Sequence, residues 1–99
     1  MKYHVIWDQF NGMAVPEGKV RSTIQEYLNN GGGQICIGDI ELLAEIRVQV
    51  RLGVIPFAEI IMTDIEDRKF YFNKHGAPLN DFWSYHCRVY DDQLFALLS

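Results

Sequence analysis

The chain has 99 residues, 48% of them hydrophobic and 22% charged, and this size and composition fit one globular domain spanning residues 1–99. The apolar fraction excludes a disordered chain, because enough surface can be buried to offset the entropy of ordering. Nine basic and thirteen acidic residues give a net charge of −4. This charge disfavours nucleic acid as a partner, because a negative field repels phosphate groups.

The cysteines and the hydrophobic runs indicate the compartment. Cys36 and Cys87 are far apart in the sequence and form no disulfide framework, which favours a reducing environment. The apolar run at the N-terminus is too short for a signal peptide, and no stretch approaches the roughly 18 apolar residues that span a membrane. We therefore expect a cytoplasmic protein that is not associated with membranes.

Residues 3–10 are rich in β-branched and aromatic side chains and predict a strand. The Asn11-Gly12 pair behind them supplies the backbone conformation of a tight hairpin, so a short return strand is expected at residues 13–15. Residues 17–29 then predict an amphipathic helix with Ile24 and Tyr27 on its apolar face. The glycines at positions 31–33 indicate the end of that helix and a turn, not a phosphate-binding loop.

Residues 40–52 satisfy two patterns at once. Every even-numbered position is apolar, and this period of two predicts a strand, which we favour for residues 46–52. A helix is the alternative, because Asp39 could cap its start, Glu41 suits its first turn and Gly53 could end it. Residues 40–45 alone do not decide between the two.

The second half of the chain predicts a further hairpin. Residues 57–65 have apolar side chains on both faces and indicate a central strand, residues 66–68 a turn, and residues 69–72 a return strand. Beyond the loop at residues 74–78, either Asn80 or Asp81 caps a helical turn or residues 82–90 form another strand. Residues 91–98 predict a short C-terminal helix.

Together these elements predict an α+β fold in which the main helix packs on one face of a mostly antiparallel sheet of about five strands. If residues 40–52 form a second helix, the order becomes β-α-β-α-β-β and the sheet is mixed. A single helical layer cannot cover both faces of such a sheet. Some of the aromatic side chains are therefore expected to remain uncovered within one protomer and to contact a ligand or another subunit. We assign this role to Trp7, Tyr71, Trp83 and Tyr85.

The polar residues offer no recognisable catalytic motif. Asp64 and Glu66 resemble an acidic turn, and adjacent residues such as His86 and Cys87 point to opposite faces of a strand. We expect no metal and no cofactor. If a pocket exists, its polar groups are expected among His4, Asp64, His75 and His86.

The resulting functional hypothesis is a small intracellular binding protein that catalyses no reaction and forms a homodimer through an aromatic sheet face. Its acidic surface would suit a basic protein partner. One alternative is a small-molecule-binding domain or modest hydrolase with an aromatic-lined pocket. Another is an acidic inhibitor of a nucleic-acid-binding protein.

Overall fold

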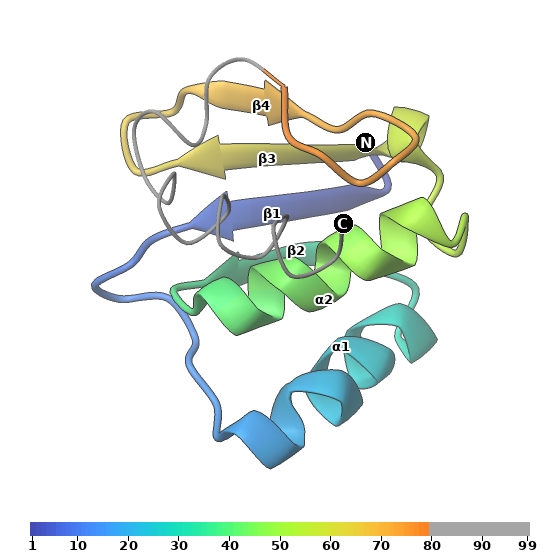
Figure 1. Ribbon diagram of the computed structural model, residues 1–99. Helices are drawn as coiled ribbons and strands as arrows, with labels where there is room; N and C mark the ends of the chain where they lie inside the picture. The colour runs from blue at the N-terminus through green and yellow to red at the C-terminus, as the bar shows by residue number, and fades with distance from the viewer. Residues whose placement is uncertain (80–99) are drawn as a thin grey trace, which may run out of the picture.

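A computed structural model describes residues 1–79 as a mixed four-stranded sheet with two α-helices. The elements follow in the order β1 (Tyr3–Trp7), η1 (Glu17–Lys19), α1 (Val20–Asn29), β2 (Gly33–Ile37), α2 (Ile40–Arg51), η2 (Phe57–Glu59), β3 (Ile60–Asp64) and β4 (Lys69–Tyr71), where η marks a short 3₁₀ turn. The strand order is β2-β1-β3-β4 (Figure 1). Strand β1 is parallel to both β2 and β3, and only β4 is antiparallel to its neighbour.

Both helices pack on the same face of the sheet, which we call the helix face. Figure 1 shows α2 in front of β2 and α1 below α2, and the two helices contact each other. The helix-face side chains form one core with those of the helices. The strand residues of this core are Tyr3, Val5, Trp7, Ile35, Ile37, Ile60, Met62 and Phe70.

The alternating residues project from the other side of the sheet, which we call the open face because neither α1 nor α2 covers it. Its residues are His4, Ile6, Gln34, Cys36, Ile61, Thr63, Lys69 and Tyr71. Most are half-buried or exposed, whereas the helix-face side chains are buried.

The first helix confirms the expectation from its apolar spacing. Ile24 and Tyr27 are buried, and the ring of Tyr27 packs edge-on against Tyr3 with centroids 6.2 Å apart. The helix ends as the glycines indicated: Gly31 and Gly32 have positive φ, and their N–H groups donate to the carbonyls of Leu28 and Tyr27.

The strand expected at residues 46–52 is wrong, and the helical alternative is correct. Positions 42, 46 and 50 lie four residues apart, a spacing that is even and also close to one helical turn, so both patterns contain them. The structure buries these three together with Leu43, which the alternating pattern placed on the wrong side. Val48 and Leu52, which the strand would have buried, are exposed.

The hairpin expected at Asn11-Gly12 is also wrong. The Asp8 carboxylate accepts hydrogen bonds from the N–H groups of Phe10 and Asn11, which curls the chain away from β1. Met13 then forms a single parallel bridge to Ile37 at the outer edge of β2. Gly12 is needed for this path, because a Cβ there would overlap the backbone of Ile37.

The second hairpin is confirmed, with β3 and β4 joined by a turn at residues 65–68. Strand β3 is interior, as expected, although the first part of the predicted strand forms the 3₁₀ turn η2. The sheet is nonetheless mostly parallel, because helices connect β1 to β2 and β2 to β3, and such crossovers return the chain to the same end of the sheet. The strand at residues 82–90 and the C-terminal helix lie outside the described residues. No helix among residues 1–79 is long and apolar enough to cross a membrane.

The N-cap of α2 gives a direct test of the helix at residues 40–51. The Asp39 side chain accepts a hydrogen bond of 2.9 Å from the N–H of Glu41. Removing it in Asp39→Ala is expected to lower the free energy of unfolding by about 1 kcal/mol, whereas Asp39→Asn keeps a capping oxygen and most of the stability. Urea denaturation measures both variants. Equal midpoints for Asp39→Ala and the wild type would contradict the cap.

The environment of the Tyr27 hydroxyl predicts that the stability of the protein falls at alkaline pH. Its hydroxyl donates to the Gly33 carbonyl at 2.7 Å, and burial, with a smaller contribution from Tyr3, raises its pKa from 10.0 to about 12. The pKa of Tyr27 is higher in the folded state than in the unfolded state. The stabilisation that its protonated hydroxyl provides is therefore complete below pH 10 and is lost as the pH rises through about 12.

Tyr27→Phe is therefore expected to be less stable than the wild type by about 1 kcal/mol at neutral pH, and the difference should shrink above pH 10. Urea denaturation across this pH range provides the measurement, with the exposed Tyr71→Phe as the control. A difference that stays constant with pH would rule out this role for the Tyr27 hydroxyl.

Candidate functional site

The polar residues proposed for a pocket lie in separate parts of the structure. His4 is on the open face, where its Nε2 is 2.9 Å from Oγ1 of Thr63. Asp64 is buried at the end of β3 on the helix face, and His75 is exposed on the loop after β4. His86 lies outside the described residues. The three described groups therefore do not share one site.

Asp64 stabilises the β3–β4 turn. Its Oδ1 accepts hydrogen bonds from the backbone N–H groups of Glu66 and Arg68, and its Oδ2 accepts one from Nε of Arg68 at 2.7 Å. The side chain is fully buried, so these donors replace the water that the carboxylate loses on folding. The turn interpretation of this acidic segment is thereby confirmed, and Asp64 acts within the fold.

The aromatic residues assigned to an interface also separate. Trp7 is only 3% exposed and packs in the core on the helix face, whereas Tyr71 is 41% exposed on the open face. Trp83 and Tyr85 lie outside the described residues. Of the four, Tyr71 is the one that the described part of the chain presents to other molecules.

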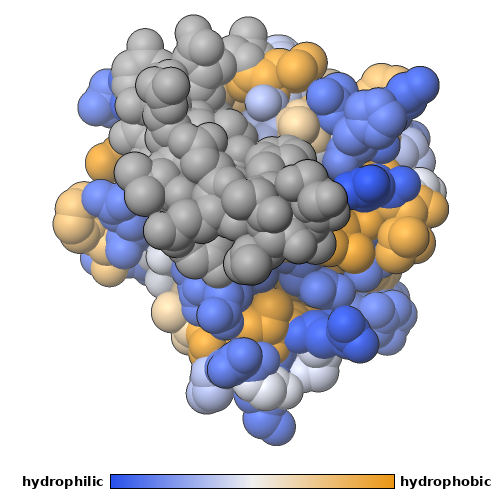
Figure 2. All heavy atoms as spheres, in the orientation of Figure 1, coloured by the Kyte–Doolittle hydropathy of each residue, from blue (hydrophilic) through white to orange (hydrophobic). Residues whose placement is uncertain are grey.

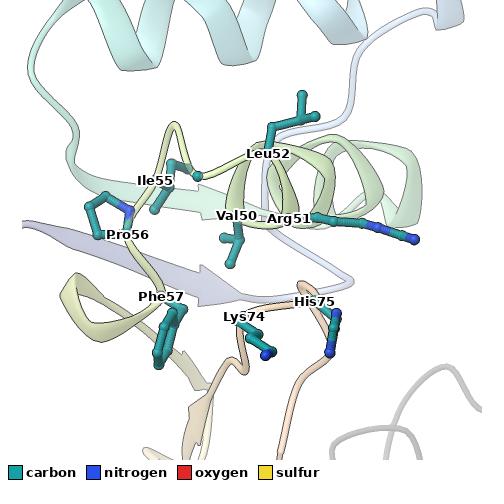
Figure 3. A pocket seen from close by; sticks show the side chains of 9 residues that line it. Val50, Arg51, Leu52, Ile55, Pro56, Phe57, Lys74 and His75 are labelled. Atoms are coloured by element: carbon teal, nitrogen blue, oxygen red, sulfur yellow. The ribbon is translucent and has the colours of Figure 1, made fainter.

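A groove that the sequence did not predict lies at the C-terminal end of α2, and we call it the α2 groove. It has a volume of about 470 Å³. On the side of the molecule where α2 ends, Figure 2 shows apolar and strongly polar side chains next to one another. The groove is lined by Val50, Arg51, Leu52, Gly53, Ile55, Pro56, Phe57, Lys74 and His75 (Figure 3).

Backbone hydrogen bonds hold the first wall of the α2 groove. Gly53, with a φ of 79°, ends α2 and donates to the carbonyl of Val50. Ile55 donates to the carbonyl of Gln49, which folds the following segment back against the helix. The side chains of Val50 and Ile55 are buried as a result and form an apolar floor.

The opposite wall is the loop at residues 73–77, which is attached to α2. The Asn73 side chain accepts hydrogen bonds from the N–H groups of His75 and Ala77. Nε of Arg47 donates to the Gly76 carbonyl at 2.8 Å. Gly76 has a positive φ, and a Cβ at this position would overlap the Arg47 carbonyl, so only glycine allows the loop to approach α2 this closely.

The ionisable side chains that line the α2 groove in the described part of the chain are all basic. They are Arg51 from the last turn of α2 and Lys74 and His75 from the loop. In Figure 3, Arg51 and His75 extend to the same side, and Val50 projects toward the loop. None of the three forms an ion pair with a carboxylate among residues 1–79. The sequence could not reveal this cluster, because more than twenty residues separate Arg51 from Lys74.

The residues that the structure describes include no group of three His, Cys, Asp or Glu side chains arranged to hold a metal ion. Comparisons of the chain with protein-family models, curated proteins and solved structures found no match. Functional inference therefore depends on the surfaces of this chain alone.

The effect of replacing Asp64 on the free energy of unfolding tests whether this residue stabilises the turn or serves a binding site. Asp64→Ala removes the carboxylate that accepts hydrogen bonds from two turn N–H groups and from Nε of Arg68, so the free energy of unfolding should fall by about 3 kcal/mol. Glu66→Ala, at an exposed position two residues further along the turn, should change the free energy of unfolding by less than about 0.5 kcal/mol. Chemical denaturation measures both. Equal effects of the two substitutions would contradict the turn role.

Proposed function

We propose that this protein acts by association and that its open face binds a second copy of the chain. The observation that carries the proposal is the placement of both described helices on the helix face, which leaves the apolar residues Ile6, Ile61 and Tyr71 on the open face without a helical layer. Two sheets packed face to face are a common way to bury such surfaces.

The charge of the open face supports a partner that is itself acidic. Of the residues that the structure describes, this face carries one charged side chain, Lys69, and no carboxylate. Two copies of a chain with a net charge of −4 could therefore meet there without placing carboxylates against one another. A basic protein partner would find no carboxylate among the described residues of this surface, so the open face favours a second copy.

The sheet edges support contact through the face over contact through an edge. At β2, Met13 bridges to Ile37 and occupies part of the outer edge. At β4, Leu79 donates to the Tyr71 carbonyl and Phe72 bridges to Pro78. Because both edge strands already have partial neighbours, addition of a further strand is less favourable than stacking of faces.

A two-fold axis parallel to the strands and between the two sheets fits the residues best. In a sheet ordered β2-β1-β3-β4, this axis places β4 of each copy over β2 of the other. Lys69 of one copy would then lie over Cys36 of the other, and Tyr71 would lie over Gln34, whose amide can form a hydrogen bond with the tyrosine hydroxyl. An axis across the strands would instead stack β4 on β4 and so bring the Lys69 side chains of both copies to the same pair of edge strands.

Sedimentation velocity over a concentration series tests the proposal. The wild-type chain is expected to be dimeric at tens of micromolar, whereas Ile61→Lys, at the centre of the open face, should be monomeric because dimerisation would bury two unpaired ammonium groups. Val48→Lys, which makes a similar change at an exposed position of α2, should remain dimeric. Circular dichroism verifies that each variant is folded.

Tyr71→Glu provides a second test if Ile61→Lys fails to fold, because Tyr71 is already 41% exposed and tolerates a polar replacement. The Tyr71→Glu variant should also be monomeric, because the two-fold axis would place a glutamate carboxylate from each copy in the interface. A monomeric wild type at tens of micromolar, or a folded Tyr71→Glu variant that stays dimeric, would overturn the proposal.

A further inference from the structure

We propose that the α2 groove is a binding site for a small organic anion, with a carboxylate or phosphate head and a short aliphatic or aromatic body. This site is separate from the open face and does not depend on dimerisation. The proposal combines the apolar floor of the groove, its basic rim and the rigidity of its two walls.

The floor of the groove suits the apolar body of such a ligand. Val50 and Ile55 are 3% and 0% exposed, so they support the base of the groove from beneath, and Phe57 provides apolar surface that a ligand can contact. Phe57 is 49% exposed at the side of the groove, although an aromatic ring gains from burial. A ligand that covers Phe57 removes apolar surface from water at about 25 cal/mol per Å².

The rim of the groove suits the anionic head. Arg51 offers a planar guanidinium for bidentate contact with carboxylate or phosphate, and Lys74 offers a mobile ammonium group. His75 adds ring N–H donors beside them. Among residues 1–79, no acidic side chain lines the groove, although acidic residues outnumber basic ones thirteen to nine in the chain. The groove thus concentrates basic groups on an acidic protein.

The end of α2 opposes an anion only weakly. A helix C-terminus carries roughly half a negative charge, from carbonyl groups without hydrogen-bond partners. Here the carbonyls of Val48, Gln49 and Val50 already accept bonds from the N–H groups of residues 52, 55 and 53. The two full positive charges of Arg51 and Lys74 therefore outweigh this opposing field.

The walls are held in place before a ligand binds. The hydrogen bonds of Asn73 within the loop and of Arg47 to Gly76 fix the backbone that carries Lys74 and His75. Binding then needs to order only side chains, which lowers its entropic cost. A volume of about 470 Å³ is within the usual range for small-molecule pockets and too small for a folded protein or a nucleic acid duplex.

Isothermal titration calorimetry with octanoate tests the site on the full-length chain, because octanoate has one carboxylate and a short aliphatic body. The wild type is expected to bind octanoate more tightly than either 1-octanol, which lacks the charge, or inorganic phosphate, which lacks the apolar body. Added salt should weaken octanoate binding, because the rim is exposed to solvent.

Substitutions locate the binding to the groove. The double variant Arg51→Gln and Lys74→Gln should bind octanoate about tenfold more weakly than the wild type, because it loses two contacts to the anionic head. A matched variant, Lys2→Gln and Lys19→Gln, makes the same change in net charge at exposed positions outside the groove and should bind as the wild type does.

The outcomes divide cleanly. Octanoate binding that is weakened in the groove variant and retained in the matched variant supports the site. The proposal is overturned if octanoate does not bind at millimolar concentration, if octanol or phosphate binds as tightly as octanoate, or if the two double variants lose affinity equally. Circular dichroism confirms that the variants are folded.

Discussion

The structure depends on the parallel pairing of β1 with both β2 and β3. This pairing places Val5 of β1 between Ile35 and Met62 in the same layer, and all three are buried against the helices. Parallel neighbours require crossover connections, so the chain must send a helix between each pair of strands. Because both described helices pack on one side, the sheet has a helix face that is apolar except for Asp64 and an open face that carries apolar and polar side chains. The proposed dimer surface follows directly from that asymmetry.

Close backbone approaches determine the rest of the architecture. Gly12 allows the segment after β1 to cross the end of β2, and Gly76 allows the loop after β4 to lie against α2. The second approach creates the α2 groove, because it brings Lys74 and His75 to the end of the helix that carries Arg51. The same contact that completes the packing of the loop thus assembles the basic rim. Stability and the proposed anion site share this element.

The two proposed surfaces use different chemistry. Among the described residues, the open face presents apolar side chains and a single charge, which suits a flat contact with another protein surface. The α2 groove presents three basic side chains over a small apolar floor, which suits one small charged molecule. They lie on different parts of the fold, so a ligand in the groove does not compete with a second copy on the open face. Binding of one partner can therefore be measured while the other is present.

The sequence by itself determined the α+β class, the helix at residues 17–29, its glycine stop and the β3–β4 hairpin, because local spacing and turn chemistry fix each of them. It did not decide residues 40–52, since positions 42, 46 and 50 satisfy a strand and a helix equally, and the two are separated by the burial of Leu43 and the exposure of Val48 and Leu52. Nor did it show that Trp7 belongs to the core or that Arg51, Lys74 and His75 line one groove. Those outcomes depend on which strands pair and which loop reaches α2, and such contacts between distant residues leave no local signal in the chain.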